Sequence, residues 1–324
     1  MEFDLIEIIR QRIARSRGDV VLGIDDDAAL LQPPPDRQLV ACTDTLVAGV
    51  HFPHDTVPED IGWKSLAVNL SDLAAMGAQP AWTMLALTLP EADERFVERF
   101  ADGFAELARR HDVALIGGDT TQGPLSITVS AFGFVPEGQA LLRSDARVDD
   151  AVFVTGMLGD AAGALEMLRD PGPGTGDSEK QSRTELLRRL HRPQPRITAG
   201  LALRGIANAC IDVSDGLLAD LGHICAARGV GAEIEADALP ISQPLRQVFA
   251  PEQCREFALA GGDDYELCFT AREADVQRSA EDLACMGCRV TRIGRIVAES
   301  GVRVFDADGS PVETPRRGWQ HFAP

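Results

Sequence analysis

Lysine is almost missing from this chain of 324 residues: only Lys64 and Lys180 occur, so arginine carries nearly all of the positive charge. A phosphate-binding G-x-x-x-x-G-K-[ST] loop is missing too, because no glycine directly precedes the lysine of Gly62-Trp63-Lys64-Ser65. The strand lysine, H-R-D and D-F-G set of protein kinases is also absent. The sequence therefore excludes the two commonest lysine-based ways of holding a phosphate chain.

Targeting and cysteine signals are scarce as well. The N-terminus, Met1-Glu-Phe-Asp-Leu5, is acidic, which argues against a secretory signal. No uninterrupted apolar stretch is long enough to span a membrane. The seven cysteines are odd in number and lie among apolar neighbours, as is typical of reduced packing residues, so we expect a cytoplasmic protein. Cys285-Met-Gly-Cys288 ends an expected helix, where neither a redox pair nor a zinc site is expected.

What the chain does have is acid. The net charge is −19, which argues against a nucleic-acid or anionic-membrane surface. Hydrophobic content of 45% is ordinary for a globular protein, and the length suffices for two domains. A protein this acidic needs cations between itself and any phosphate that it binds.

Hydrophobic periodicity predicts alternating helices and strands in both halves, and hence a fold of α/β or α+β layers. The polar stretch 143–150 marks the expected domain boundary, and 171–178 reads as a surface loop. In the N-terminal half we expect helices at 2–17, 59–76 and 92–110, and strands at 20–24, 28–31, 38–43, 81–89, 113–117 and 125–135. In the C-terminal half we expect strands at 151–155, 231–235, 265–270, 289–297 and 302–305, and helices following 156–163 and at 184–191, 195–208, 215–228 and 273–286.

The strand expected at 125–135 has two apolar faces. Ile127 and Val129 point one way, whereas Phe132 and Phe134 point the other. Helices can cover only one face of a small sheet, so a second subunit is the simplest cover for the other face. The alternative is a sheet layered on both sides within one chain. We expect a homodimer.

The glycines that follow the strand at 151–155 imitate a dinucleotide fingerprint. Their spacing, Gly156-Met-Leu-Gly159-Asp-Ala-Ala-Gly163, differs from G-x-G-x-x-G. No acid ends a second strand about 20 residues further on, as the ribose contact would require. We expect no nicotinamide site here.

Five apolar runs that read as strands end in small residues followed by aspartate. Ligands collect outside the carboxyl ends of strands in α/β proteins, and carboxylate oxygens are the ligands that Mg²⁺ prefers. Each aspartate alone could be a turn or helix-cap residue, but five repeats favour a site for several metal ions and phosphate. The runs lead into Asp25-Asp26-Asp27, Asp44, Asp119, Asp212 with Asp215, and Asp263-Asp264.

The helix expected at 59–76 carries one polar stripe. Ser65, Asn69 and Asp72 are spaced i, i+4 and i+7 on an otherwise apolar helix. A buried carboxylate needs a partner, which could be an internal hydrogen bond or a metal ion. Together with the aspartates above, a metal ligand is the better interpretation of Asp72.

These motifs together closely resemble the thiamine-monophosphate kinases, a family of the aminoimidazole-ribonucleotide-synthetase-like superfamily. The resemblance spans nearly the whole chain, in order. It is carried by Asp26-Asp27-Ala-Ala-Leu30, Thr43-Asp44-Thr-Leu-Val-Ala-Gly-Val-His51-Phe52, Asn69-Leu-Ser-Asp72-Leu-Ala-Ala-Met76, Gly117-Gly118-Asp119-Thr-Thr121, Asp212-Val-Ser214-Asp215-Gly-Leu217 and Gly261-Gly-Asp263-Asp-Tyr-Glu-Leu267.

The resemblance implies that ATP and thiamine phosphate give ADP and thiamine diphosphate. It implies two domains, with residues 1–145 binding ATP and Mg²⁺ and dimerising through their sheets, and 146–324 completing the active site. Matched position by position, the magnesium ligands are Asp27, Cys42, Thr43, Asp44, Asp72, Asp119, Asp212 and Asp215. The ATP contacts are Gly118, Asp119, Arg143 and Ser214, and the substrate contacts are His51, Asp263 and Trp319.

Three positions depart from the family pattern. Asp25 stands where the family usually has Gly, which adds charge beside the metals. Cys42 replaces a usual Ser or Thr, so this magnesium contact would need the backbone carbonyl. Asp263 replaces a usual Glu and is one methylene shorter, so its reach to the substrate is expected to pass through water.

The chemistry suits this set of residues. Donor and acceptor both carry phosphate and repel each other until several Mg²⁺ ions lie between them. A phosphate monoester is mostly dianionic at pH 7, because its second pKa is about 6. The acceptor therefore needs no general base, and His51 is expected to orient or contact phosphate. We expect direct in-line transfer, with Trp319 facing the thiazolium cation; its alternative role is packing on the core.

Other activities fit part of the pattern. Selenophosphate synthetase, in the same superfamily, uses a reactive Cys or selenocysteine and a Lys near its N-terminus, and neither occurs before Cys42 and Lys64. Aminoimidazole-ribonucleotide synthetase is a second relative. A metal-dependent phosphatase would share the carboxylates but transfer to water. An acidic cation-binding protein would explain the charge, although EF-hand spacing is absent.

Overall fold

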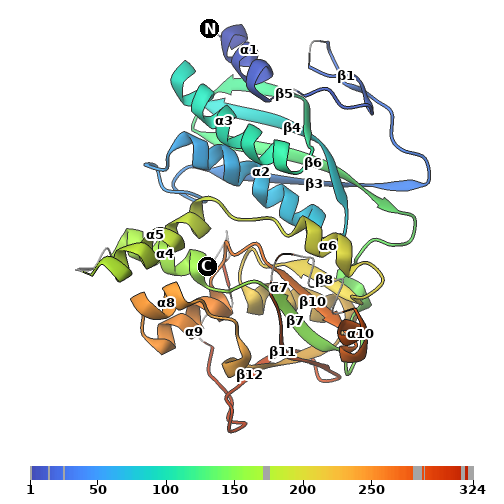
Figure 1. Cartoon of the computed structure of the whole chain (residues 1–324), viewed down its shortest axis with the longest axis vertical. Coiled ribbons are helices and arrows are strands. Elements are labelled where there is room, and N and C mark those ends of the chain that lie inside the picture. The colour runs from blue at the N-terminus through green and yellow to red at the C-terminus, as the bar shows by residue number, and fades with distance from the viewer. Residues whose placement is uncertain are drawn as a thin grey trace. The chain divides into compact units, whose positions relative to one another are not determined.

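Three β-sheets and the helices around them make up the computed structural model, which describes residues 2–13, 15–24, 26–170, 176–279, 287, 289–314 and 318–319 (Figure 1). Contacts divide the chain into two units, Met1–Leu73 with Ala78–Gly138, and Ala74–Gly77 with Gln139–Pro324. Of the helices described, none is both long and apolar enough to cross a membrane. Cys285 and Cys288 lie outside the described residues.

The first unit is built on a four-stranded sheet of order β3-β6-β4-β5. Strands β4 and β5 run parallel, whereas β6 is antiparallel to both β3 and β4. Parallel neighbours need a crossover, and α3 supplies it between β4 and β5. The strands are β3 Arg37–Val47, β4 Gln79–Leu89, β5 Ala114–Gln122 and β6 Ser126–Pro136.

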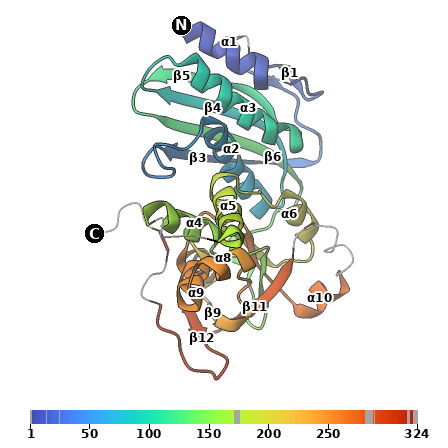
Figure 2. The ribbon, with the colours of Figure 1, turned by 60° about the vertical axis from the view of Figure 1, so that its left-hand side comes forward.

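Helices α1 (Glu2–Ile13), α2 (Pro58–Ala75) and α3 (Glu94–Arg110) accompany this sheet (Figure 2). Helix α3 begins at Asp93, whose carboxylate accepts a hydrogen bond from the Phe96 amide. The spacing of four residues brings Phe96, Phe100 and Phe104 onto one face, with neighbouring ring centroids 6.3 and 6.2 Å apart. These rings fix how α3 packs into the core.

A short hairpin, β1 (Val20–Leu22) and β2 (Leu30–Leu31), covers part of the second face of the sheet. Phe132 and Phe134 form an apolar cluster with Trp82, and hairpin residues pack against it. The two phenylalanines that suggested a partner subunit are therefore covered, at least in part, by their own chain. Other residues of the first unit's sheet remain open, because Leu39 is 53% and Met84 42% exposed.

The second unit holds a mixed six-stranded sheet of order β12-β9-β11-β7-β10-β8. Only β12 and β9 pair in parallel. Helix α7 (Leu217–Arg228) packs its leucines on this sheet and buries the main core of the unit. The strands are β7 Ala151–Thr155, β8 Ala209–Asp212, β9 Gly231–Glu235, β10 Leu267–Ala271, β11 Val290–Val297 and β12 Gly301–Phe305.

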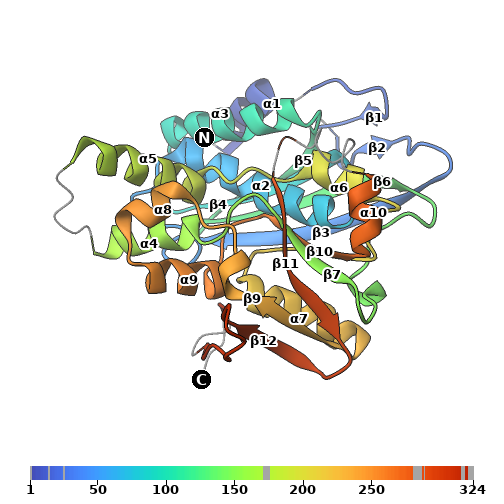
Figure 3. The ribbon, with the colours of Figure 1, turned by 60° about the horizontal axis from the view of Figure 1, so that its bottom comes forward.

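A second apolar cluster joins α4, α5, α8 and α9, and Figure 3 shows α4, α8 and α9 side by side. Leu186, Leu245 and Cys254 are fully buried in it. The helices are α4 Asp160–Arg169, α5 Asp177–His191, α6 Ile197–Leu203, α8 Gln243–Val248, α9 Pro251–Ala260 and α10 Glu273–Arg278.

Several expectations differ from these bounds. Helices α8 and α9 were not predicted, although each has proline at its first or second position, where proline favours a helix start. Helix α8 has only six residues, too few to show a clear helical period. Helix α5 begins at Asp177, inside the expected loop, and α6 ends at Leu203 rather than at residue 208. The expected helix at 273–286 is described as far as Arg278.

The idea that the aspartates follow strand ends is wrong for two of them. Asp44 lies inside β3 and Asp119 inside β5. Backbone pairing continues through both residues, because a strand forms through its peptide groups while one row of its side chains stays open to solvent. Asp212 is the last residue of β8, as expected.

Candidate active site

In the first unit, β3 and α2 bring three of the predicted metal ligands together. Asp44 on β3 hydrogen-bonds Asp72 on α2, and burial raises the pKa of Asp44 above its ordinary value. The Cys42 thiol also hydrogen-bonds Asp72 and lies 3.4 Å from the Asn69 carbonyl oxygen. Burial, followed by the nearby Asp72 and Asp44 carboxylates, raises the pKa of Cys42, so the thiol is neutral. Two carboxyl groups in direct contact share a proton unless a cation separates them.

The other members of the polar stripe on α2 have internal partners. The Ser65 hydroxyl donates to the Gly62 carbonyl at 3.0 Å, and the Asn69 side-chain Nδ2 donates to the Ser65 carbonyl at 3.1 Å. Both side chains are buried. Internal hydrogen bonds therefore account for Ser65 and Asn69. Asp72 is the member of the stripe that contacts another acid, Asp44.

Thr43 and Asp119 belong to the opposite face of the same sheet. The Thr43 hydroxyl lies 2.6 Å from the Ser130 hydroxyl, across the strand pair. Asp119 pairs with Ala86, which in turn pairs with Thr128. Thr128 and Ser130 lie on one face of β6, so the side chains of Asp119 and Thr43 are on the same face of the sheet. Gly118 permits a close backbone approach here, because a Cβ at this position would lie 1.8 Å from the Leu85 carbonyl oxygen.

Two further predicted residues of the first unit lie outside these groups. Asp27 is exposed in the segment between β1 and β2, where its amide donates to Asp26. The His51 Nδ1 accepts a hydrogen bond from the Val47 amide at 2.9 Å. That contact requires an unprotonated Nδ1, so in the neutral ring the proton sits on Nε2. This bond fixes the orientation of the His51 ring.

In the second unit, the loop between β8 and α7 carries Asp212, Ser214 and Asp215. Asp212 is buried at the end of β8. Three successive amides, those of Ser214, Asp215 and Gly216, donate to one oxygen of Asp220 at 3.0, 3.1 and 3.0 Å. Burial, and next the charge of Asp212, raises the pKa of Asp220 to about 7.

The segment of Asp263 is bonded to the same loop. The Asp263 amide donates to the Ser214 carbonyl at 2.9 Å, and the Tyr265 amide donates to the Val213 carbonyl at 2.8 Å. Asp263 and Tyr265 both have positive φ, 69° and 51°, which is uncommon outside glycine. The Tyr265 hydroxyl donates to the Asp263 carboxylate at 3.0 Å. Backbone strain of this kind gathers at functional sites.

Trp319 joins this loop as well. Its amide donates to the Asp215 carbonyl at 3.0 Å, and its side chain is 50% exposed. A large aromatic ring left half open, and held beside a predicted metal ligand, is available to a ligand. Arg143 is exposed too, in a short 3₁₀ turn (η1, Arg143–Asp145) next to Leu142, which bridges to β8.

Neighbouring acids of the 261–267 motif hold structure. The Glu266 carboxylate is buried in an ion pair with Arg196 and accepts from the Thr155 hydroxyl at 2.7 Å. Asp264 accepts from the Gly159 amide at 2.7 Å, just before α4. The start of α4, where a dinucleotide would place its pyrophosphate, is therefore occupied by a side chain of the protein.

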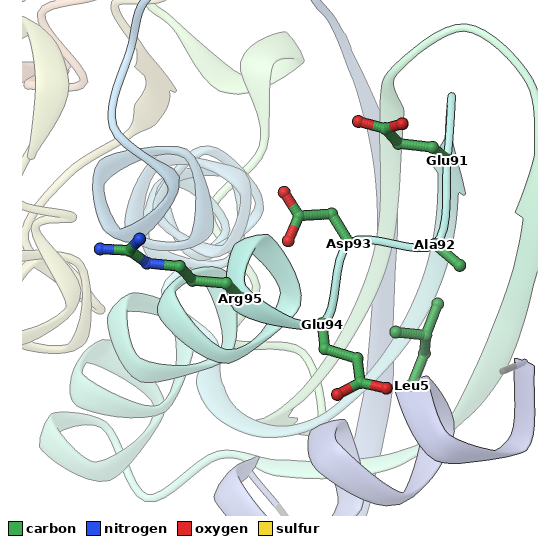
Figure 4. Close-up of a pocket in the computed structure, with 6 residues that line it drawn as sticks. All are labelled: Leu5, Glu91, Ala92, Asp93, Glu94 and Arg95. Carbon is green, nitrogen blue, oxygen red and sulfur yellow. The ribbon is translucent and has the colours of Figure 1, made fainter.

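A surface hollow of about 430 Å³ lies at the start of α3, lined by Leu5 and residues 91–95. Figure 4 shows the carboxylates of Glu91, Asp93 and Glu94 around it, with Arg95 directed away from Glu91. Asp93 already caps α3. None of the predicted site residues lines this hollow, so it is separate from the clusters described above.

Known proteins match the chain over its whole length. The family descriptions "AIR synthase related protein, N-terminal domain" and "AIR synthase related protein, C-terminal domain" match residues 25–135 and 147–307. Thiamine-monophosphate kinase of Escherichia coli (strain K12) is 48% identical, over 99% of this chain and 98% of its own. The chain belongs to the thiamine-monophosphate kinase family.

Solved structures of this family agree. The crystal structure of thiamine-monophosphate kinase from Stenotrophomonas maltophilia K279a matches with a TM-score of 0.87 and 53% identity, covering 96% of this chain and 98% of its own. AaThiL complexed with AMPPCP and TMP matches with a TM-score of 0.77 and 33% identity, over 99% and 97% of the two chains. The mixed α/β fold in two domains is thus that of the family.

Sequence reasoning missed two residues of this family member. Asp220 organises the loop of Ser214 and Asp215, and its place in the first turn of α7, four residues after Gly216, is a signal that a search for helix-capping acids would find. Tyr265, which holds the Asp263 carboxylate, is the single tyrosine of the chain. No local spacing rule predicts that contact, because it depends on the positive φ of both residues.

Replacing Asp44 by Asn should stabilise the metal-free protein at pH 8. The folded-state pKa of Asp44 is raised, so its contribution to stability is greatest at low pH and is lost as pH rises through that pKa. Each unit of raised pKa corresponds to about 1.4 kcal/mol. Thermal melting in EDTA at pH 5 and pH 8 measures the gain, with exposed Asp55→Asn as the control. A variant less stable than wild type at pH 8 would contradict the assignment.

Proposed function

We propose that this protein transfers the γ-phosphoryl group of ATP to thiamine phosphate and so makes thiamine diphosphate. The observation that carries the proposal is the match, over 99% of the chain, to AaThiL complexed with AMPPCP and TMP. The relatives of the same name at high coverage support it. The proposed reaction also fits the lack of a lysine-based phosphate loop in the sequence, because metal ions would then neutralise the phosphate charge.

Magnesium would be held by the predicted carboxylates. The fit is good in the first unit, where Asp44 and Asp72 contact each other and Asp44 resists ionisation while no cation is near. A hard divalent ion held by these carboxylates would offset the cost of burying their charge. When bound, such ions neutralise phosphate charge and align donor and acceptor. The proposed ligands are Asp27, Cys42, Thr43, Asp44, Asp72, Asp119, Asp212 and Asp215, with Cys42 acting through its carbonyl.

The remaining site residues would bind the two substrates. Gly118, Asp119, Arg143 and Ser214 are proposed to contact ATP, and His51, Asp263 and Trp319 thiamine phosphate. The Val47 amide orients the His51 ring, which is proposed to contact phosphate. The exposed indole of Trp319 offers a face to the thiazolium cation.

Transfer is proposed to be direct. The acceptor phosphate is already anionic near pH 7, so positioning and charge neutralisation suffice without a general base or a phosphoenzyme. The alternatives are another ATP-dependent synthetase of the superfamily and a metal-dependent phosphatase. They differ in acceptor, so the identity of the products separates them.

The proposed reaction is tested by following ADP and thiamine diphosphate in parallel, with and without thiamine phosphate. Wild-type protein should form both in equal amounts and only when both substrates and Mg²⁺ are present. Chiral γ-thiophosphate ATP should give inverted product. Asp72→Asn should fold, and its free energy of unfolding should fall by no more than about 1 kcal/mol, as when a helix cap is removed. Its activity should nevertheless fall by orders of magnitude. ATP hydrolysis independent of thiamine phosphate would favour the phosphatase instead.

Trp319→Ala should raise the KM for thiamine phosphate by about 2- to 30-fold, the equivalent of a cation–π contact of roughly 0.5–2 kcal/mol. The KM for ATP should stay nearly unchanged, because only binding to one substrate is removed. Trp319→Phe keeps an aromatic face and serves as the matched control. Equal damage to both KM values would indicate a packing role for the indole.

The N-terminal domain, residues 1–145, is proposed to carry ATP and Mg²⁺ sites and to form a homodimer. Residues 146–324 supply the remaining contacts. Support for the dimer comes from the open part of the four-stranded sheet, with Leu39 and Met84 exposed beside the hydroxyls of Thr43 and Thr45. A cytoplasmic location is proposed from the cysteine usage.

Light scattering should give about twice the chain mass of 34.8 kDa. Leu39→Glu should shift the protein toward monomer, because a charge would be buried in the proposed interface. Leu168→Glu, at another exposed leucine (41%, on α4 of the second unit), should leave the mass unchanged. A wild-type monomer at micromolar concentration would refute the dimer.

A further inference from the structure

Asp220 is a buried carboxylate with an unusual set of partners. It lies in the first turn of α7 and is only 3% exposed. One of its oxygens accepts hydrogen bonds from the amides of Ser214, Asp215 and Gly216. Burial of a carboxylate is costly, and three hydrogen bonds to one oxygen offset part of that cost.

Helix capping explains only part of this arrangement. A capping acid reaches back to the amide of the N-cap residue, which here is Gly216. The other two amides belong to Ser214 and Asp215, which precede the helix. Three successive amides that point to one oxygen form the kind of nest that elsewhere binds phosphate. Here the nest is filled by Asp220, so Ser214 and Asp215 have no amide left for a ligand.

The bonds of this loop extend to two more segments. The Ser214 carbonyl accepts from the Asp263 amide, and the Asp215 carbonyl accepts from the Trp319 amide. A Cβ on Gly262 would lie 2.4 Å from the Ser214 carbonyl oxygen, so the 261–265 segment fits tightly against the loop. The conformation imposed by Asp220 therefore fixes residues that otherwise share no element of secondary structure.

We propose that Asp220 is a positioning residue for Mg²⁺–ATP, acting through the loop of Ser214 and Asp215. The inference rests on the proposed function. With both amides bonded to Asp220, the groups that Ser214 and Asp215 can offer are the hydroxyl and the carboxylate. Asp220 sets where those two groups point, and through the Asp263 and Trp319 amides it also sets the substrate-facing segments.

The first experiment measures hydrogen exchange in the metal-free protein at the amides of residues 214–216. Asp220→Ala should speed exchange at these three amides and leave the strands of the sheet protected. Asp220→Asn keeps an acceptor oxygen without the charge, so its effect should be smaller. The matched control is Asp150→Asn, since Asp150 is equally buried and accepts from the Arg147 amide and the Asn208 side chain. Unchanged protection at 214–216 in Asp220→Ala would overturn the proposal.

The second experiment measures binding of a non-hydrolysable ATP analogue by calorimetry at several Mg²⁺ concentrations. Asp220→Ala should weaken Mg²⁺-dependent binding about 10- to 100-fold, the range usual for residues that orient metal ligands, with partial rescue in Asp220→Asn. Asp150→Asn should lower only the melting temperature. If Asp220→Ala does not fold, Asp220→Asn must show selective loss of protection and weaker binding. Equal binding by folded variants and wild type would overturn the proposal.

Failure of the proposed function gives a different result. A wild-type protein that binds the Mg²⁺–ATP analogue but does not phosphorylate thiamine phosphate would overturn the reaction while leaving the role of Asp220 intact. A wild-type protein that binds no Mg²⁺–ATP analogue would overturn both. The exchange data separate the loop from the reaction, because they need no substrate.

Discussion

Placing many carboxylates close together is the constraint on which this structure depends, and the protein meets it in two ways. In one, the carboxylate accepts backbone amides, as Asp220 does from residues 214–216 and Asp264 does from Gly159. In the other, two carboxyl groups meet directly, as Asp44 and Asp72 do between β3 and α2. The first arrangement fixes the backbone that donates the amides, although burial still raises the pKa of Asp220 and of Asp264. The second joins acids of two elements through their side chains alone, which separates acids that organise a loop from acids that meet across elements.

This distinction explains which parts of the site the sequence could predict. The stripe on α2 was correctly placed on a helix, because i, i+4 and i+7 spacing defines one face. Sequence alone could not separate its members, since the Ser65 and Asn69 side chains donate to carbonyls within α2 while the Asp72 carboxylate meets Asp44 of β3. The difference between these side chains depends on the contact between β3 and α2, two elements that are separated in sequence. A periodicity within one helix cannot reveal such a contact.

The fold shows the same division between local and distant causes. The periodic phenylalanines of α3 and the apolar runs of β4 and β6 were enough to predict those elements. Helices α8 and α9 were missed, because their short apolar faces become evident only where they pack into the apolar cluster with α4 and α5. Phe132 and Phe134 were correctly seen as a second apolar face, but their cover includes a hairpin of the same chain. A strand pattern shows that a face is buried and leaves its partner undetermined.

The Asp263 position shows how backbone and chemistry can conflict. Its φ of 69° lies in the left-handed region, where Asp is several-fold enriched among non-glycine residues. The shorter acid therefore suits the backbone better than the Glu usual in the family, at the cost of one methylene of reach. The Tyr265 hydroxyl, bonded to the Asp263 carboxylate at 3.0 Å, restricts that side chain further. Tyr265 is itself strained at a φ of 51°, a conformation that costs on the order of 1–3 kcal/mol. The loop bonds to Val213 and Ser214 hold both residues in place, so the Asp263 carboxylate is held in a fixed position.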